Sequence, residues 1–247
     1  MSDKKIALIT GANKGIGFET AKQLAQKGIT VLIGARDVSE GNEAADSLKA
    51  ENFDAHFVEL DIVDEKTRES AREFIEKQFG KLDILINNAA VDLEGSAEGT
   101  AKTASETTLK TYRETFETNL FGLIAVTQTF LPLIRKSDAG RIVNVSSIRG
   151  SLTHQSDPND DLYDKKVPAY DVTKTAINAF TVSLAVELKD TKIKVNIAHP
   201  GWVKTEMGGG DADLTIEDGA KTSVDLATLD ENGYTGKFIY LGEELPW

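Results

Sequence analysis

Short apolar runs alternate with amphipathic stretches along almost the whole chain. Seven of these runs have the length and residue types of strands, at positions 6–9, 30–33, 56–60, 84–86, 141–145, 194–198 and 238–241. Several are apolar at consecutive positions, which is typical of parallel strands covered by helices on both faces. The pattern predicts a single α/β domain over residues 1–247, with a three-layer, doubly wound parallel sheet of about seven strands.

Helical spacing fills the intervals between these runs. Apolar residues repeat at a helical period before Gly28, which is a common stop signal for a helix. A second helical run covers residues 112–133, and a longer helix opens at Tyr170. Strands and helices therefore alternate, as they do in repeated units around a parallel sheet.

Three segments interrupt this alternation and are predicted to be loops: 92–106, 150–168 and 204–214. In doubly wound sheets, ligands bind outside the carboxyl ends of the strands, and the second and third segments follow such ends. We expect 150–168 and 204–214 to line a substrate pocket. We interpret 92–106 as an insertion on the surface.

The composition narrows the classes of function. The chain has 247 residues and a net charge of −12, whereas nucleic-acid binding needs clustered Lys and Arg. It has no cysteine, and its three histidines lack the spacing of a metal site. The apolar stretch 120–134 is too short and too polar to span a bilayer, and the N-terminus shows no targeting pattern. We expect a cytoplasmic protein that binds a small molecule, without a metal, a nucleic acid or a membrane.

A glycine-rich segment joins the first predicted strand to the first helix. Residues 10–17 read Thr-Gly-Ala-Asn-Lys-Gly-Ile-Gly, with three residues between Gly11 and Gly15 where the commoner fingerprint has one. Glycine allows positive φ and a close approach of the backbone to a pyrophosphate, and the free N–H groups of a helix start bind anions. This context predicts a dinucleotide site.

The residues after the second predicted strand bear on the choice of dinucleotide. An acid that accepts from the ribose of NAD is usual there, but this chain has Ala35 followed by Arg36. Arg36 and Lys14 can converge on a 2′-phosphate, which predicts a preference for NADP(H) over NAD(H). The alternative is that both cations are solvated and that Asp37 contacts the ribose. Asp61, after the third strand, either accepts from the adenine amino group or caps a helix.

A tyrosine and a lysine provide a candidate for proton transfer. Tyr170 and Lys174 are four residues apart, so a helix places them on one face. A positive charge about 4 Å from a phenol would lower its pKa by ~3 units, toward neutrality. The same spacing also occurs on exposed helices. Ser147 follows a predicted strand and could donate to a substrate oxygen, whereas Asn119 could equally be a buried structural amide.

Six motifs follow one another along nearly the whole chain: residues 10–17, Asn-Asn-Ala-Ala at 87–90, Asn119, Ser147, Tyr170 with Lys174, and Pro200-Gly201. In this order they resemble the short-chain dehydrogenase/reductase family. Within that family, Lys14, Arg36 and the run 199–207 are most similar to the NADPH-dependent carbonyl reductases.

This resemblance implies a Rossmann fold and a catalytic tetrad. Tyr170 would be the general acid/base, and Lys174 would lower its pKa and hold the nicotinamide ribose. Ser147 would orient the substrate oxygen, and Asn119 would support a water that relays protons. The implied NADP(H) site consists of Gly11, Asn13, Lys14, Gly15, Ile16, Gly17, Arg36, Asp61, Ile62, Asn88, Ala89, Tyr170, Lys174, Pro200, Val203 and Thr205.

Two features depart from the family pattern. Ala90 stands where glycine is usual, a change of little consequence if its backbone angles are ordinary. The interval from Ser147 to Tyr170 is long, so 150–168 is expected to shape the substrate pocket. Because an insertion there blocks oligomerisation in some carbonyl reductases, the quaternary state stays open between a monomer and a homo-oligomer, either dimer or tetramer.

The activity that the resemblance implies is NADPH-dependent reduction of aldehydes or ketones to alcohols. A second enzymatic possibility is a dehydrogenase or reductase of a hydroxysteroid, a sugar or a 3-oxoacyl thioester. A third, from another class, is a catalytically silent regulator that binds a dinucleotide.

Overall fold

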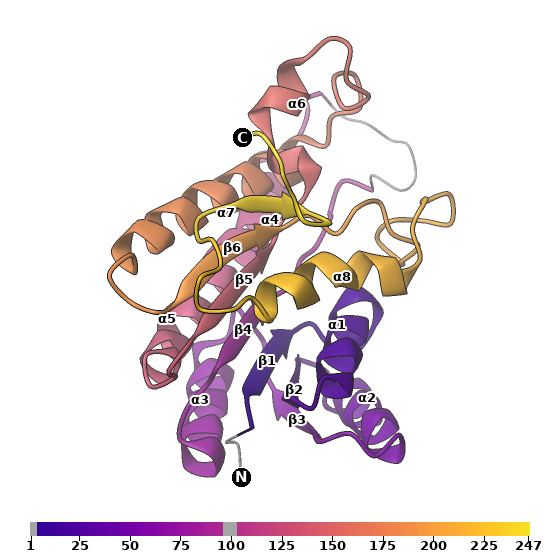
Figure 1. Cartoon of the computed structure of the whole chain (residues 1–247). Coiled ribbons are helices and arrows are strands. Elements are labelled where there is room, and N and C mark those ends of the chain that lie inside the picture. The colour runs from indigo at the N-terminus through magenta and orange to yellow at the C-terminus, as the bar shows by residue number, and fades with distance from the viewer. Residues whose placement is uncertain (1–3, 96–102) are drawn as a thin grey trace.

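The strands form one sheet. The computed structural model describes residues 4–95 and 103–247. Its strands are β1 (Ile6–Thr10), β2 (Thr30–Ala35), β3 (Ala55–Glu59), β4 (Ile84–Asn87), β5 (Arg141–Val145), β6 (Lys194–Ala198), β7 (Phe238–Tyr240) and β8 (Glu243–Glu244). They lie in the order β3-β2-β1-β4-β5-β6-β7-β8 (Figure 1). The first seven pair in parallel, and β8 pairs with β7 antiparallel.

The predicted fold class is confirmed. All seven predicted strands are present, and the strand order reverses at β1 and β4, as a doubly wound sheet requires. The strand β8 is an addition that the hydrophobic pattern does not predict, because its two glutamates are charged and exposed.

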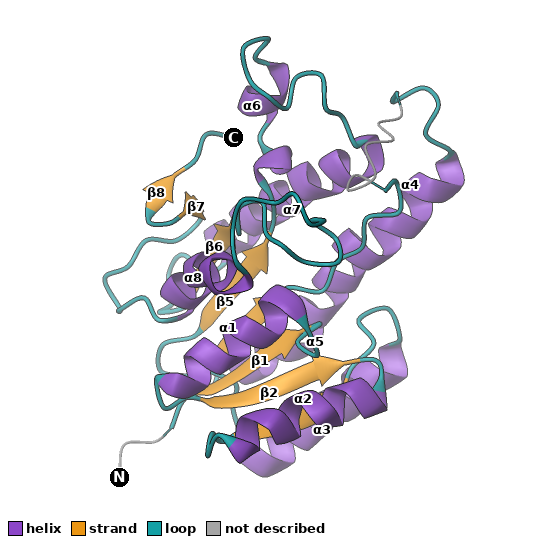
Figure 2. Cartoon of the chain, turned by 90° about the vertical axis from the view of Figure 1, so that its right-hand side faces the viewer, coloured by secondary structure: helices purple, strands orange, loops and turns teal. Residues whose placement is uncertain are grey.

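Helices cover both faces of this sheet (Figure 2). They are α1 (Gly15–Gln26), α2 (Val38–Ala50), α3 (Glu65–Phe79), α4 (Leu109–Phe116), α5 (Leu123–Ile134), α6 (Leu152–Ser156), α7 (Pro168–Glu187) and α8 (Ile216–Ala227). Of the two larger hydrophobic cores, one lies between the sheet and α1, α2 and α8, and the other lies between the sheet and α3, α5 and α7. Because β1 and β2 are covered on both sides, every residue in them is buried. No helix in the described ranges has the length and apolar character needed to cross a membrane.

Two predicted segments differ from their expected form. The helical run 112–133 consists of α4 and α5 joined by a π-helical turn at Glu117–Gly122. The segment 150–168 is not entirely a loop, because it contains the short helix α6. Ser151 caps this helix, since its hydroxyl oxygen accepts from the N–H of His154.

The other two interrupting segments have different outcomes. The segment 204–214 contains neither helix nor strand, as predicted, and it is closed at its base by backbone pairing between Val203 and Leu214. Residues 96–102 of the predicted surface insertion 92–106 lie outside the described residues. At the start of that segment the prediction is wrong, because Glu94 is buried.

The parallel register brings the carboxyl ends of the central strands to one edge. Thr10 at the end of β1 is level with Gly34, and Asn87 at the end of β4 is level with Asn144. Val145 at the end of β5 pairs with Ala198 at the end of β6. The segments that follow β1, β4, β5 and β6 therefore leave the sheet at the same edge, which is where doubly wound proteins bind ligands.

Candidate active site

The glycine-rich turn leaves the carboxyl end of β1 and enters α1. Gly11 and Gly15 have φ angles of +61° and +59°, a conformation that other residues rarely adopt. Gly17 has no space for a side chain, because a Cβ there would overlap the carbonyl oxygen of Gly11 and lie 2.5 Å from Asn88 Nδ2. The turn is therefore closely packed and exposes backbone at a helix start, the geometry that a pyrophosphate site requires.

We expect Gly17→Ala to lower both stability and NADPH affinity. The added methyl group must displace Gly11 or Asn88, and overpacking of this kind costs about 1–3 kcal/mol. Thermal unfolding and fluorescence titration with NADPH measure the two effects. Gly28→Ala is a suitable control, because Gly28 has a φ of +80° and no heavy atom within 4 Å of a Cβ. Gly28→Ala should lose stability but bind NADPH normally. An unchanged affinity for NADPH in Gly17→Ala would contradict the prediction.

Asn88 and Ala89 hold the glycine-rich turn against the end of β4. The hydroxyl oxygen of Thr10 accepts from the backbone N–H of each residue at 3.0 Å. Asn88 Nδ2 donates to the carbonyl oxygens of Thr10 and Gly11 at 2.9 and 3.2 Å. Ala90 does not have a positive φ, so the absence of the usual glycine requires no strained backbone.

The turn also contacts segments on either side. Asn13 Nδ2 donates to a carboxylate oxygen of Glu40 in α2 at 2.6 Å. A Cβ on Gly15 would lie 3.7 Å from the methyl group of Thr205, in the segment after β6. Ile16 is partly buried in the first turn of α1, and its carbonyl oxygen accepts from the hydroxyl of Thr20 at 2.7 Å. The predicted cofactor residues from the first and sixth strands are therefore neighbours.

Lys14 and Arg36 bring two exposed cations to the ends of β1 and β2. The pKa of Lys14 is raised mainly by its ion pair with Glu206, at 2.5 Å, and the nearby charge of Arg36 opposes this shift. Asp37 caps α2 instead of standing free, because its carboxylate accepts from the N–H of Glu40 at 2.9 Å. The two cations predicted to meet the 2′-phosphate therefore share one region.

Asp61 and Ile62 follow β3 at the same edge. Asp61 accepts from the N–H of Val63 at 3.1 Å, whereas the cap of α3 is Asp64. Ile62 is buried beside Gly122. The interpretation of Asp61 as a helix cap is therefore wrong, and its contact with adenine stays a prediction.

Tyr170 and Lys174 lie one turn apart on α7 and share a face. Lys174 is buried, and its Nζ lies 5.2 Å from the centroid of the Tyr170 ring. The same nitrogen donates to the carbonyl oxygen of Val145 at 2.9 Å. Because Val145 ends β5, the amine reaches the carboxyl edge of the sheet. The predicted pairing of phenol and ammonium on one helix face is confirmed.

The predicted fall in the pKa of Tyr170 is wrong. Burial raises the pKa of the phenol above its ordinary value, the charges of Asp92 and Asp171 raise it further, and Arg149 opposes them. Burial also lowers the pKa of Lys174 to about 8. Loss of water disfavours the charged forms of both groups. The phenol therefore keeps its proton at neutral pH.

The two serines after β5 have different surroundings. Ser146 is buried, and its hydroxyl donates to the carbonyl oxygen of Lys174 at 3.2 Å. Ser147 is partly exposed, and its hydroxyl oxygen accepts from the N–H of Arg149 at 3.3 Å. Ser146 therefore supports the backbone of α7, and Ser147 remains the predicted donor to a substrate oxygen.

Asn119 lies in the π-helical turn and is buried. Its amide oxygen accepts from the N–H of Val91 at 2.8 Å, and its Nδ2 donates to the carbonyl oxygen of Val91 at 2.9 Å and to Thr173 Oγ1 at 3.4 Å. The side chain thus joins the segment after β4 to α7, next to Lys174. These contacts agree with the alternative that Asn119 is a buried structural amide. The residue also lies in a π-helical turn, which is often found at functional sites. Its support of a water stays a prediction.

The segment after β6 carries the predicted residues Pro200, Val203 and Thr205. Val203 is buried, and the hydroxyl oxygen of Thr205 accepts from the N–H of Gly208 at 3.0 Å. Pro200 is partly exposed at the sheet edge. The segment is therefore an ordered turn that continues toward Glu206, the partner of Lys14 across the site.

His199 connects this segment to the turn after β5. Its Nδ1 accepts from the N–H of Ile148 at 3.2 Å and from that of Gly201 at 3.3 Å. Burial lowers the pKa of His199 to about 4, so the ring is neutral and can accept both bonds. A neutral imidazole therefore fixes the backbone beside Ser147.

We expect His199 to make the protein less stable in acid. Its pKa is below the ordinary value of 6.5, so below pH ~6.5 the unfolded chain binds a proton that the folded protein excludes until about pH 4. The free energy of unfolding should fall by about 2–3 kcal/mol from pH 7 to pH 4.5 through this group. Urea unfolding of the wild type and of His199→Asn, whose amide oxygen accepts without titrating, measures the difference. Identical pH dependence in the two proteins would contradict the prediction.

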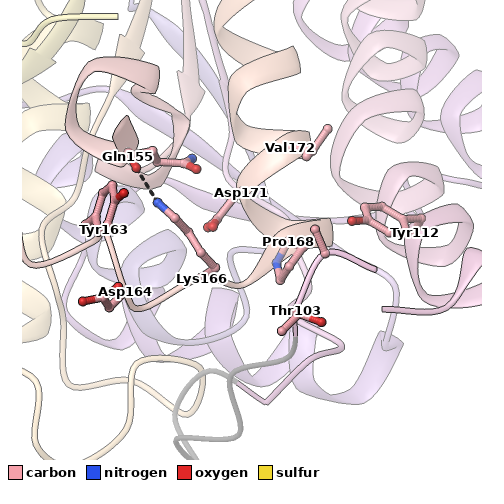
Figure 3. A pocket seen from close by; sticks show the side chains of 10 residues that line it. Thr103, Tyr112, Gln155, Tyr163, Asp164, Lys166, Pro168, Asp171 and Val172 are labelled. Atoms are coloured by element: carbon pink, nitrogen blue, oxygen red, sulfur yellow. Dashed lines mark hydrogen bonds between the residues drawn. The ribbon is translucent and has the colours of Figure 1, made fainter. Parts of the chain in front are cut away.

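A cavity of about 580 Å³ lies beside the first turn of α7 (Figure 3). It is lined by residues from two of the irregular segments and from α4 and α7, namely Thr103, Ala104, Tyr112, Gln155, Tyr163, Asp164, Lys166, Pro168, Asp171 and Val172. Lys166 crosses one side and donates to the carbonyl oxygen of Gln155 at 2.6 Å. None of the four predicted catalytic residues is among the described residues of this lining. The segment 150–168 thus borders α7, and its part in a substrate pocket stays a prediction.

Three residues that hold the start of α7 were not indicated by sequence patterns: Glu94, Arg149 and Asp171. The carboxylate of Glu94 accepts from the backbone of this turn, and Asp171 forms an ion pair with Arg149 at 3.2 Å. Asp171 could have been noticed as an acid in a first helical turn. No local signal marks Glu94, because its partner Ala169 is 75 positions away.

The parallel sheet, the crowded glycine turn and the tyrosine–lysine face at one edge define a class, the dinucleotide-dependent α/β oxidoreductases. The chain belongs to the short-chain dehydrogenase family, whose model, described as short chain dehydrogenase, matches residues 5–213.

Individual relatives extend this likeness over nearly the full chain. Salutaridine reductase from Papaver bracteatum is 35% identical over 97% of this chain and 95% of its own. Carbonyl reductase 1 from Mus musculus, whose name specifies NADPH, is 33% identical over 100% of this chain and 99% of its own. The solved structure of an NADPH-bound carbonyl reductase from chicken fatty liver has a TM-score of 0.84 at 26% identity, over 99% of both chains.

Proposed function

We propose that the protein reduces aldehydes or ketones to alcohols with NADPH and that Tyr170 donates the proton. The observation that carries this proposal is the buried Nζ of Lys174, 5.2 Å from the centroid of the Tyr170 ring at the edge where the glycine-rich turn leaves the sheet. NADPH, when bound, supplies the hydride. The likeness to salutaridine reductase and to an NADPH carbonyl reductase supports this choice of reaction.

Each proposed catalytic side chain has a separate task. The Tyr170 phenol, protonated at neutral pH, gives its proton to the carbonyl oxygen. The ammonium of Lys174 stabilises the phenolate that remains and holds the nicotinamide ribose. Ser147 donates a second hydrogen bond to the substrate oxygen. Asn119 keeps the segment after β4 in register with α7 and supports a water that relays protons.

We further propose that the cofactor is NADP(H) in preference to NAD(H). Lys14 and Arg36 would hold the 2′-phosphate with charge-assisted hydrogen bonds. The capping of α2 by Asp37 supports this choice, because an acid engaged in that way is a poor partner for a ribose 2′-hydroxyl. The backbone of the glycine-rich turn would hold the pyrophosphate.

The test is NADPH consumption by the purified protein with a panel of substrates. The panel contains aldehydes, linear and cyclic ketones, keto forms of hydroxysteroids, keto sugars and a 3-oxoacyl thioester. We expect turnover with the simple and cyclic carbonyl compounds. Turnover confined to the steroid, sugar or thioester would indicate the second enzymatic function, and NADPH binding without turnover on any compound would favour a silent regulator.

A further inference from the structure

The start of α7 is held by a carboxylate from a distant part of the chain. Glu94, in the segment after β4, is buried, with 5% of its surface exposed. Its Oε2 accepts from the backbone N–H groups of Ala169 and Tyr170, at 2.8 and 3.0 Å. Its Oε1 accepts from the hydroxyl of Thr107 at 3.0 Å, just before α4. One side chain therefore joins three segments at the backbone of Tyr170.

This carboxylate completes the hydrogen bonding of the first turn. A helix start leaves N–H groups without partners inside the helix, and the N-cap residue Val167 offers no side-chain cap. The N–H of Val167 donates to Asp171 Oδ2 at 3.0 Å, and Pro168 has no N–H. The groups that remain, on Ala169 and Tyr170, both go to the distant carboxylate. Because Ala169 is fully buried, water is a poor substitute there.

We infer that Glu94 is a positioning residue for Tyr170, which holds the first turn of α7 and thereby the phenol in place. The inference rests on the proposed role of Tyr170 as proton donor. Proton transfer depends on alignment, and a displacement of ~1 Å can lower a rate by about 10²-fold. A negative charge at a helix start is also stabilising by itself, so the experiment must separate position from charge.

Two conservative variants make this separation. E94Q keeps the length of the side chain and an oxygen that can accept from Ala169 and Tyr170. Its amide nitrogen would face Thr107, whose hydroxyl can donate instead to the carbonyl oxygen of Thr103, at 3.2 Å. E94D keeps the charge but is one methylene shorter. We expect kcat within about threefold of wild type for E94Q and about tenfold lower for E94D, with the KM for NADPH unchanged in both.

Hydrogen exchange measures the stability of the capped first turn of α7 independently of catalysis. Exchange of the backbone amides of Ala169 and Tyr170 should be at least about tenfold faster in E94D and close to wild type in E94Q. The matched control is Asp64→Ala, which removes another carboxylate cap, on α3, where Asp64 accepts from the N–H of Lys66 at 2.9 Å. It should speed exchange in α3 and leave kcat unchanged.

The outcomes separate this inference from the function on which it rests. Wild-type kcat in E94D, or equal losses in E94D and E94Q, would overturn a positioning role for Glu94. If E94D does not fold, Thr107→Val gives a milder test, because it removes the hydroxyl that holds Oε1, and kcat should fall about threefold. Normal turnover in Tyr170→Phe would show that Tyr170 is not the proton donor. Loss of turnover in Tyr170→Phe together with normal kcat in E94D would contradict only the role of Glu94.

Discussion

Tyr170→Phe should lower the kcat of carbonyl reduction by about 10³-fold. A positioned general acid contributes roughly 10²- to 10⁴-fold to a rate, and the phenol of Tyr170 is held protonated at neutral pH by burial. Phenylalanine keeps the ring that lies beside Lys174 and removes only the oxygen. The Kd for NADPH should therefore change little, so the loss should appear in kcat and not in cofactor binding.

The measurement is steady-state reduction of the best carbonyl substrate, together with fluorescence titration of NADPH. Tyr234→Phe is the matched control, because it removes the same atom from a tyrosine after α8, 37% exposed, to which no part in catalysis is assigned. It should keep wild-type turnover. If Tyr170→Phe reduced the substrate as fast as this control, Tyr170 would not be the proton donor.

Removal of Lys14 or Arg36 should weaken NADPH binding and leave NADH binding nearly unchanged. Each hydrogen bond to a charged group contributes about 1.5–3 kcal/mol, so each alanine variant should raise the Kd for NADPH by about 10- to 100-fold. The double variant should lose up to about 10³-fold, because both cations would contact the same phosphate. Since NADH lacks the 2′-phosphate, its Kd should change by less than about threefold in all three variants.

Titrations with both dinucleotides measure this change in selectivity. Lys22→Ala is the control, because Lys22 is another lysine on the surface of α1, paired with Glu51 at 2.8 Å, and should affect neither Kd. Glu206→Gln tests the same site in the opposite direction. It releases Lys14 from an exposed ion pair and should tighten NADPH binding by about threefold. Equal losses for NADPH and NADH in the Lys14 and Arg36 variants would contradict the proposed phosphate site.

Local patterns made most of the fold predictable. Consecutive apolar positions in 6–9 and 30–33 identify strands buried on both faces, and the structure has β1 and β2 there. Glycines at Gly11 and Gly15 indicate a turn with positive φ, which both residues adopt. A four-residue spacing suffices to place Tyr170 and Lys174 on one helix face, because helix geometry relates them without reference to the rest of the chain.

Features that depend on distant segments were not predictable in this way. The π-helical turn around Asn119 has no periodic pattern distinct from that of an α-helix, so the hydrophobic pattern predicts one helical run over 112–133. The composition of 92–106 predicts a surface insertion, and only the partners of Glu94 in α7 explain why this acid is buried. The pKa of Tyr170 shifts in the direction opposite to the prediction, because the sequence shows the nearby charge of Lys174 but not the loss of water around the phenol.

The sequence by itself determined the alternation of strands and helices that is typical of a doubly wound α/β fold, the glycine-rich turn, and the placement of Tyr170 and Lys174 on one helix face. These depend on period and on short spacing, which the chain carries locally. Only the tertiary structure decided that Lys174 is buried, that Glu94 caps the first turn of α7, and that Glu206 pairs with Lys14. Those properties depend on exclusion of solvent and on contacts between segments far apart in the chain. A local stretch of residues determines neither of them.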